Sequence, residues 1–193
     1  AGRALAVSRH LQLLAQAVGN TSVAAFALSD SKGGSVGQIA LVNPHWEALT
    51  PETRHAFYHV ASLHLTSQFY LAGGTGLALH LGHRFSVDLD FFSSASDAVG
   101  PDVRTVLREA LDDPTLSITH DKDGTFTAMW RKVGISFFRL HLYPLVQQPV
   151  LIEGVRLATV AEIGAMKLAA IIGRGARKDL VDLYYILQRE PMK

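Results

Sequence analysis

Two glycines and two aspartates lie close together in a pattern suited to chemistry on phosphate groups. Gly73 and Gly74 precede Thr75, and Asp88 and Asp90 follow in the next apolar segment. Side chains two residues apart on a strand point to the same face of a sheet, so the two carboxylates would lie side by side. Paired carboxylates bind Mg²⁺, which in turn holds phosphates, and glycines let backbone N–H groups approach a phosphate. The pattern predicts phosphoryl-group chemistry.

Each half of this pattern also has a simpler explanation. A Gly-Gly turn before a helix can be a loop that requires positive φ angles. The two acids can lie on a polar strand face turned to solvent. Ionised carboxylates are costly to bury unpaired. Between Val87, Leu89 and Phe91 they therefore require a cation, a basic partner or water.

A second group of charged residues lies near the C-terminus. Asp179 and Asp182 are three residues apart on an expected helix and share one face of it, with Lys178 adjacent. Favourable interaction with the helix dipole would explain Asp179 well and Asp182 only in part. Lys167 lies in an apolar helix. It either extends its ammonium group to the surface or meets a phosphate or an acid in an active site.

The order of expected elements defines the fold class. Apolar spacing and capping residues predict helices over 51–65, 75–81, 101–111, 160–172 and 178–188. Strands are expected over 69–72, 87–93, 116–120, 126–131 and 135–142, with a short extended piece at 150–157 and tight turns at 121–124 and at Val133 and Gly134. This order predicts an α+β fold: a mixed sheet with flanking helices and a C-terminal helical part.

The composition limits the classes of protein to consider. With 193 residues the chain is long enough for one well-buried domain. We expect that domain over 46–193, preceded by an extension of uncertain role over 1–45 with a helix at 5–18. A net charge of +1 predicts neither nucleic-acid nor membrane binding from bulk charge. The chain has no cysteine, no apolar run long enough for a membrane span and no secretory signal, so a cytoplasmic location is expected.

Histidines and basic residues near the two motifs offer further candidates. His80 and His83 would share a helix face that could bind a metal, but no third ligand follows at a recognisable spacing. Packing or nucleotide contact is the alternative for both. Arg84, Arg174, Arg177 and Lys178 either form a local positive patch for RNA or triphosphate, or are solvated surface charges.

The motifs together resemble a known family. The run Leu-Ala-Gly-Gly-Thr followed by Gly-His-Arg-Phe-Ser-Val-Asp-Leu-Asp-Phe-Phe, within 70–92, resembles the AbiEii/AbiGii toxin family of nucleotidyltransferases. The segments Ala-Met-Lys-Leu-Ala-Ala from Ala165 and Arg-Lys-Asp-Leu-Val-Asp-Leu-Tyr-Tyr from Arg177 resemble its later motifs, so the resemblance covers about 48–189.

The resemblance implies a fold, a reaction and partners. It implies a DNA-polymerase-β-like nucleotidyltransferase fold and the toxin half of a toxin–antitoxin or phage-defence pair, with a cognate antitoxin as a partner. Members of the family transfer a nucleotide from an NTP to an acceptor, which in the MenT-like branch is the tRNA 3′ end. The implied catalytic residues are Asp88, Asp90, Lys167 and Asp179. Asp88 and Asp90 would hold Mg²⁺ or Mn²⁺, and the implied triphosphate-binding residues are Gly73, Gly74, Thr75, Lys178 and Asp182.

One departure from the fold's usual pattern affects the mechanism. Polymerase-β-like enzymes usually place a third carboxylate on a later strand, where it helps to activate the acceptor hydroxyl. The expected strands 126–131 and 135–142 contain no Asp or Glu. Asp179 or Asp182 could substitute as a base or second metal ligand, the two-metal description could fail here, or the enzyme could be weakened.

The leading hypothesis is therefore a Mg²⁺-dependent transfer of NMP to a cellular acceptor, most readily RNA such as the tRNA 3′ end. Two alternatives stay open from the sequence. The first is a transferase of the same fold that acts on a protein or small-molecule hydroxyl. The second is a nucleotide-binding or partner-binding module without turnover, which the missing third acid would explain.

Overall fold

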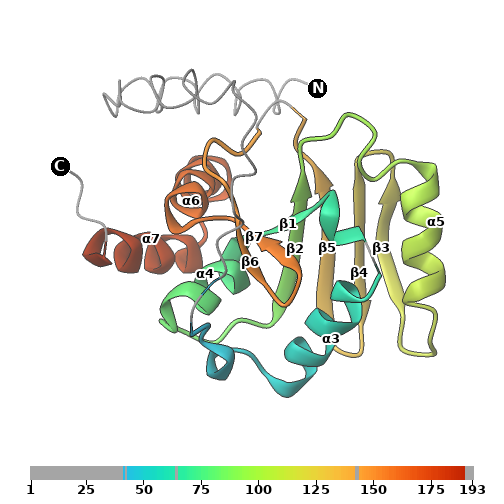
Figure 1. The fold of residues 1–193 in the computed structure, drawn as a ribbon, viewed down its shortest axis with the longest axis horizontal. Coiled ribbons are helices and arrows are strands. Elements are labelled where there is room, and N and C mark those ends of the chain that lie inside the picture. Colours follow the sequence, from blue (N-terminus) through green and yellow to red (C-terminus); the bar gives the residue numbers. More distant parts are fainter. Residues whose placement is uncertain (1–40, 42, 64, 142–143, 190–193) are drawn as a thin grey trace, which may run out of the picture.

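A seven-stranded mixed sheet forms the centre of the protein (Figure 1). The computed structural model describes residues 41, 43–63, 65–141 and 144–189, and the expected helix at 5–18 lies outside them. The strand order is β3-β4-β5-β2-β1-β7-β6. The fold is thus the predicted α+β arrangement of a mixed sheet with flanking helices.

The strands and helices match the expected ones in type and order, except that the single extended piece expected over 150–157 forms two antiparallel strands, β6 and β7, which turn at Glu153 and Gly154. The strands are β1 (Tyr70–Leu71), β2 (Asp88–Ser93), β3 (Ser117–Lys122), β4 (Thr125–Trp130), β5 (Val133–Arg139), β6 (Val150–Ile152) and β7 (Val155–Leu157). The helices are α3 (Pro51–Ala61), α4 (Gly73–Leu81), α5 (Pro101–Ala110), α6 (Val160–Arg174) and α7 (Arg177–Arg189), with short 3₁₀ helices η1 (Trp46–Ala48) and η2 (Leu65–Ser67).

The central strand β2 separates an apolar face of the sheet from a polar one. It pairs in parallel with β5 and antiparallel with β1. Leu89 and Phe91 are fully buried and join Phe57 of α3 in the main apolar cluster, whereas the alternate positions Asp88 and Asp90 are only half-buried. Because successive side chains of a strand point to opposite faces, the apolar residues of β2 lie in the core and its acids lie on the other face.

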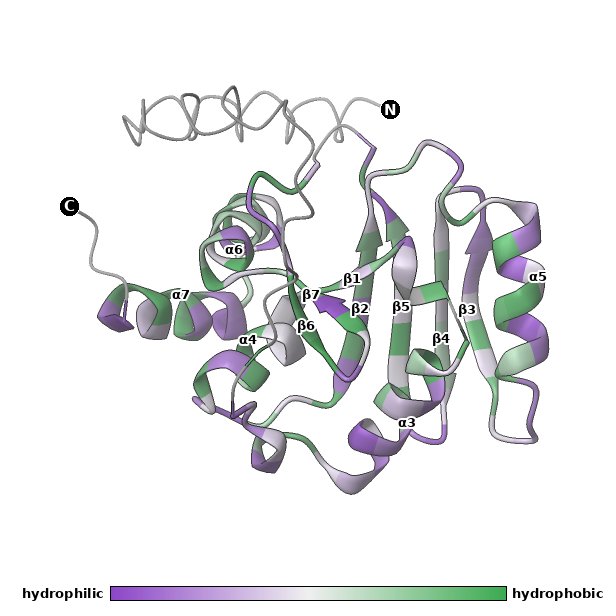
Figure 2. Cartoon of the chain, viewed as in Figure 1, coloured by the Kyte–Doolittle hydropathy of each residue, from purple (hydrophilic) through white to green (hydrophobic). Residues whose placement is uncertain are grey.

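The helices divide between the two faces and edges of the sheet. In Figure 1, α4, α6 and α7 lie together on the side of β1 and β7, and α5 lies beside β3 at the opposite edge. A second apolar cluster joins Tyr70 and Leu77 to Ile163 of α6 and Ile186 of α7. Figure 2 shows α5 with hydrophobic and hydrophilic residues interleaved, as an amphipathic helix at the edge of a domain requires. Within the described residues, no helix combines the length and the hydropathy needed to cross a bilayer.

The turn predicted at Val133 and Gly134 is wrong. The β4–β5 hairpin turns at Arg131 and Lys132, which both have positive φ angles of 48° and 68°. Val133 is buried in the core, and Gly134 lies within β5 opposite Asp88. The local glycine rule failed because this glycine is needed beside a carboxylate and not in the turn.

Three other boundaries also differ from the sequence prediction. β3 continues to Lys122, so the turn is confined to Asp123 and Gly124, whose φ is +78°. Helix α3 ends at Ala61 and does not reach residue 65. Helix α4 begins at Gly73, so the two glycines form its first turn and do not precede it.

Part of the predicted N-terminal extension lies within the described residues. The backbone N–H of Leu41 donates to the Leu151 carbonyl at 2.7 Å, and that of His45 donates to the Leu79 carbonyl at 3.0 Å. Leu41 also packs against the main apolar cluster. These residues therefore contact the main domain, and the boundary between 45 and 46 stays a prediction.

Candidate active site

A cleft of about 720 Å³ opens on the polar face of β2. It is bordered by the start of α4, by β2 and β5, and by α6 and α7. The predicted site residues that line it are Gly73, Gly74, Asp88, Asp90, Lys167 and Lys178. Thr75, Asp179 and Asp182 lie behind its wall, so the structure brings six of the nine predicted residues to one surface.

Neighbouring side chains approach the first turn of α4 so closely that both of its first positions require glycine. An added Cβ on Gly73, whose φ is +64°, would lie 2.7 Å from Asp90 Oδ2. On Gly74 it would lie 2.4 Å from a guanidinium nitrogen of Arg84. The first turn of α4 therefore meets an acid and a cation of the cleft directly. Its N–H groups, which have no partner within the helix, are available to an anion there.

Thr75 has a different contact from the one predicted. Its hydroxyl donates to Ser86 Oγ at 2.8 Å and also contacts the main-chain carbonyl oxygen of Asp88, and its side chain is buried. Both contacts join α4 to the start of β2. Thr75 thus fixes the position of the Asp88 backbone and does not line the cleft itself.

Asp88 and Asp90 share the cleft face of β2. Burial raises the pKa of Asp90, and the charge of Asp88 raises it further; Lys178, Lys167 and a hydrogen bond from Ser136 partly offset this. Two carboxylates that repel each other in a cleft suit a divalent cation, which would relieve the repulsion. In the part of the chain that the structure describes, no third His, Cys, Asp or Glu completes a metal cluster. Mg²⁺ commonly takes two carboxylates and completes its shell with substrate phosphates and water.

The strand beside the acids is β5, and it offers no carboxylate. Parallel pairing places Gly134 opposite Asp88 and Ser136 opposite Asp90. An added Cβ on Gly134 would lie 2.7 Å from Asp88 Oδ1. The two positions of β5 opposite the acids are therefore a serine and a glycine, and the glycine leaves room for the Asp88 side chain.

Gly134→Ala is expected to weaken Mn²⁺ binding roughly ten- to a hundredfold, because the new methyl group displaces the Asp88 carboxylate. Isothermal titration with Mn²⁺ measures this. Gly173→Ala is the matched control, since nothing lies within 4 Å of an added Cβ at Gly173. Equal metal affinity in both variants would contradict the close fit at Asp88.

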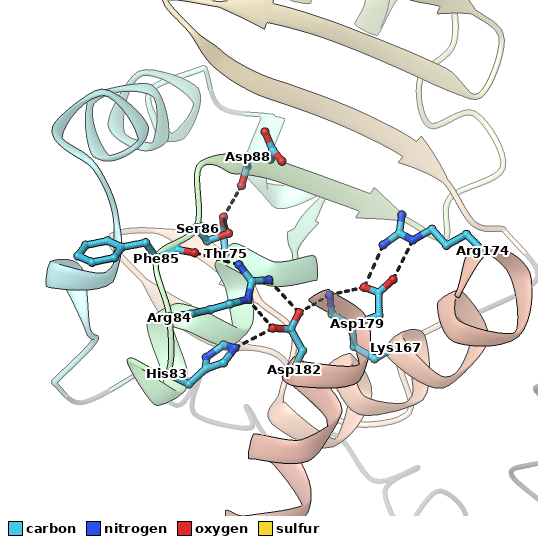
Figure 3. A network of polar contacts seen from close by, with 10 residues as sticks. All are labelled: Thr75, His83, Arg84, Phe85, Ser86, Asp88, Lys167, Arg174, Asp179 and Asp182. Carbon is cyan, nitrogen blue, oxygen red and sulfur yellow. Dashed lines mark hydrogen bonds and ion pairs between the residues drawn. The ribbon is translucent and has the colours of Figure 1, made fainter. Parts of the chain in front are cut away.

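Lys167 connects the two C-terminal acids (Figure 3). Its ammonium lies 2.9 Å from Asp179 Oδ1 and 2.5 Å from Asp182 Oδ2. All three side chains are buried, with Asp179 and Asp182 fully excluded from solvent. Lys167 therefore does not extend to the surface: it meets two acids, and it also borders the cleft.

Each of the two acids binds a further cation. Arg174 donates to both oxygens of Asp179, at 2.8 and 3.0 Å. Arg84 donates to both oxygens of Asp182, at 2.6 and 2.9 Å, and His83 Nε2 lies 2.8 Å from Asp182 Oδ1. We define the acid–cation network as Arg84, His83, Lys167, Arg174, Asp179 and Asp182.

The network keeps both acids ionised. Burial alone would raise the pKa of Asp182, but hydrogen bonds from His83, Arg84 and Lys167 outweigh it and hold the pKa well below the ordinary value. For Asp179, hydrogen bonds from Arg174 and Lys167 likewise overcome burial and lower the pKa. A carboxylate with a lowered pKa and its oxygens already hydrogen-bonded is poorly suited to accept a proton. Its effect here is to fix the cations beside the cleft.

The shared metal face considered for His80 and His83 does not form. Helix α4 ends at Leu81 and Gly82 follows in a left-handed conformation. His80 Nε2 is hydrogen-bonded to the Ala158 carbonyl at 2.8 Å, whereas His83 contacts Asp182. The two rings are thus used in separate structural contacts.

Lys178 is the basic residue of the cleft with the freest side chain. It lines the cleft and its charge acts on Asp90. Unlike Lys167 it makes no ion pair with the described residues. Arg177, its neighbour, is exposed and does not border the cleft, so the predicted positive patch comprises Arg84, Arg174 and Lys178 without it.

Sequence reasoning missed the contributions of β5 and the far end of β2. Val133, Ile135 and Phe137 alternate as core residues, and this pattern alone assigns Gly134, Ser136 and Phe138 to the opposite face. The same alternation on β2 adds Phe92 to the face of Asp88 and Asp90. The alternation of core residues is visible in the sequence of each strand, but the pairing of β2 with β5 is not.

Solved structures share this fold. JHP933 from Helicobacter pylori matches with a TM-score of 0.51 and 22% identity, over 74% of this chain and 68% of that one. The Megavirus polyadenylate synthase matches with a TM-score of 0.53 and 13% identity, over 74% of this chain and 32% of that one. These matches define the fold class, the DNA-polymerase-β-like nucleotidyltransferase fold, in which the acid pair and the glycine-headed helix lie side by side here.

The family follows from the sequence comparisons. The model for "Nucleotidyl transferase AbiEii toxin, Type IV TA system" matches residues 56–193. An uncharacterized protein of Aquifex aeolicus (strain VF5) is 33% identical over 143 residues, which are 73% of this chain and 68% of that protein. The chain belongs to the AbiEii family of nucleotidyltransferase toxins, as its motifs indicated.

Proposed function

We propose that this chain transfers a nucleoside monophosphate from an NTP to an RNA acceptor such as the tRNA 3′ end. The observation that carries the proposal is the pair Asp88 and Asp90 beside the first turn of α4, with Lys167 and Lys178 acting on the same carboxylate. Family membership supports the toxin role and a cognate antitoxin as partner. An RNA acceptor would place the reaction in the cytoplasm.

The residues of the cleft divide the work between them. Asp88 and Asp90 would hold Mg²⁺ or Mn²⁺, which supplies positive charge to the phosphate oxygens during transfer. The first turn of α4, at Gly73 and Gly74, would bind the β- and γ-phosphates through its N–H groups. Because such transfers depend mainly on positioning and charge, these fixed groups account for most of the chemistry.

Basic side chains would balance the charge of the departing pyrophosphate. Lys178 lines the cleft and its charge acts on Asp90, and Arg84 lies against Gly74. Asp182 holds Arg84 from behind, and Asp179 holds Lys167 and Arg174. We therefore assign Asp179 and Asp182 a positioning role in place of acceptor activation or direct triphosphate binding.

A second candidate function rests on Ser136. This serine stands opposite Asp90, and the described residues that line the cleft include no carboxylate besides Asp88 and Asp90, the proposed metal ligands. A protein that binds Mg·NTP without turnover is consistent with this. Release of pyrophosphate in the presence of an acceptor would exclude that alternative.

The deciding experiment supplies each of the four α-³²P-labelled NTPs, with Mg²⁺ or Mn²⁺, to total RNA, cell protein and small metabolites. Label on RNA that is lost in Asp88→Ala supports the proposal. Label on protein or on a small molecule would show that the acceptor class is wrong while the transferase site is right. Binding of NTP with no labelled product would favour the non-catalytic module.

Lys178→Ala is expected to raise the KM for NTP roughly tenfold, the scale of one charge-assisted hydrogen bond. Arg177→Ala removes the adjacent exposed charge from outside the cleft and should leave KM within about twofold, as for a weak surface charge. Initial rates over a range of NTP concentrations measure both. An equal effect of the two changes would mean that general surface charge, and not Lys178, attracts the nucleotide.

A further inference from the structure

The cleft has a direction along β2. At one end Gly74 lies against Arg84. Asp88 and Asp90 follow, and Phe92 continues the same face beyond them. Phosphate-binding groups, acids and aromatic rings thus succeed one another, and Phe92 stands about 7 Å beyond Asp90 along the strand.

Three rings form a row across the sheet at the far end. Register places Tyr70 of β1 opposite Phe92 of β2, and Phe92 opposite Phe138 of β5. The Tyr70 and Phe92 rings stack with centroids 6.0 Å apart, and the Phe92 and Phe138 rings with centroids 5.4 Å apart. Tyr70 is buried in the second apolar cluster, while Phe92 and Phe138 are partly exposed and line the cleft.

Helix α6 supplies an apolar wall to the same cleft. Met166 and Ala170 are four residues apart and so share a helix face, and both line the cleft. Met166 and Phe92 pack against the same apolar cluster. Lys167, between Met166 and Ala170, keeps the helix fixed through Asp179 and Asp182. Rings on the sheet and a thioether on the helix form an apolar slot beside the acids.

We propose that this slot, with Phe138 and Phe92 as its floor and Met166 at its side, binds the nucleobase of the incoming NTP. The inference rests on the proposed function, since it takes the phosphates to lie at the first turn of α4. Aromatic rings bind bases through stacking, which tolerates any base identity. The slot is then the feature that distinguishes a nucleoside triphosphate from a bare polyphosphate.

The in-line geometry of the transfer indicates that the slot binds the base of the NTP and not a base of the acceptor. The attacking and leaving oxygens lie on opposite sides of the transferred phosphorus. The leaving pyrophosphate lies at α4, on the β1 side of β2, so the acceptor hydroxyl approaches over β5 at Gly134 and Ser136. The nucleoside would therefore extend in the remaining direction, along β2 toward Phe92. Its sugar would lie between the two acids and the aromatic rings.

The test measures binding of the whole 193-residue chain to Mg²⁺ complexes of each NTP and of inorganic tripolyphosphate. We expect Phe138→Ala to weaken NTP binding about tenfold, the usual scale for loss of one stacking ring, and to leave tripolyphosphate binding unchanged. Phe138→Trp should restore NTP affinity. Phe138 belongs to neither apolar core cluster, so thermal unfolding of the variant should match that of the wild type.

Tyr184→Ala is the matched control. Tyr184 is an aromatic residue of α7 that is 59% exposed and does not line the cleft, so its loss should leave NTP affinity unaltered. If Phe138→Ala leaves NTP affinity unchanged but weakens binding of a single-stranded RNA oligonucleotide, the slot belongs to the acceptor and the proposal is overturned. If wild-type protein binds tripolyphosphate as tightly as NTP, no base site exists although the phosphate site does. Failure to bind either ligand would overturn the proposed function itself.

Discussion

Asp90→Asn is expected to reduce nucleotide transfer by roughly a thousandfold or more, the scale that phosphoryl-transfer enzymes lose with one charge-stabilising group. Asparagine keeps the shape of the side chain but removes the charge that a divalent cation requires. The measurement is label transfer from NTP to acceptor at saturating substrate. NTP binding in the presence of Mg²⁺ should weaken as well.

The same substitution is expected to make the metal-free protein more stable. Burial, followed by the charge of Asp88, raises the pKa of Asp90 in the folded state. Asp90 therefore favours folding when protonated, below its unfolded pKa near 3.8, and this contribution is lost as the pH rises through the folded value. At pH 7, thermal unfolding without metal should occur at a higher temperature in Asp90→Asn than in the wild type. Added Mn²⁺ should raise the Tm of the wild type only.

Asp112→Asn controls for loss of a carboxylate as such. Asp112 is exposed and makes no ion pair with the described residues, so activity and Tm should both be unaltered. If Asp90→Asn retains full transfer activity, Asp90 is not a metal ligand in the reaction. If it lowers the metal-free Tm, the two acids do not repel each other as their placement indicates.

Asp182→Ala is expected to destabilise the protein by about 3–5 kcal/mol, the usual cost of removing one partner from a buried ion pair. Asp182 is fully buried and bonds to His83, Arg84 and Lys167. Without it, Arg84 and Lys167 lose a counter-charge in a poorly solvated position. Urea unfolding followed by circular dichroism measures the free energy.

The network also predicts sensitivity to acid. Hydrogen bonds from cations lower the pKa of Asp179 and Asp182 in the folded state despite burial. Their contribution to stability is therefore present above the unfolded value near 3.8 and is lost as the pH falls through the folded values. Asp182→Ala should flatten the decline in unfolding free energy on the acid side, because one of the two acids is gone.

Two further variants separate burial of charge from loss of an acid. Asp121 also binds two arginines, Arg104 and Arg108, but at the surface, so Asp121→Ala should cost far less than Asp182→Ala. Adding Arg84→Met to Asp182→Ala removes a cation whose ion pair among the described residues is with Asp182, and should recover part of the lost stability. Equal costs at positions 121 and 182 would show that the buried network is not what holds α7 to the domain.

The sequence predicted the elements better than it predicted their partners. Alternation along β2 placed Asp88 and Asp90 on one face, and this depends only on local backbone geometry. The opposing residues Gly134 and Ser136 could not be assigned, because strand pairing between segments far apart in the sequence is not encoded in either strand alone. The turn predicted at Val133 and Gly134 was misplaced for the same reason. The need for glycine at position 134 becomes clear only when its neighbour in the sheet, Asp88, is known.

The C-terminal acids illustrate a second limit. Spacing on α7 correctly placed Asp179 and Asp182 on one face, and both are buried there. Their partners Arg84 and His83 come from a loop far upstream in the sequence. Helical periodicity indicates that the two acids share a face of α7, but it does not indicate which basic residues contact that face. The resemblance to a family named the residues without distinguishing those that line the cleft from those that support it.

The acid–cation network also has a consequence for how the protein is made. Arg84, Lys167 and Arg174 precede in the chain the two acids that neutralise them. Because a chain emerges from the ribosome from its N-terminus, a nascent chain that has not yet reached Asp179 carries these three cations without their counter-charges. These cations can therefore be fixed beside the cleft only after α7 has been synthesised and has packed against the rest of the domain. Folding of the cleft thus depends on a helix that is made well after the strand that carries Asp88 and Asp90.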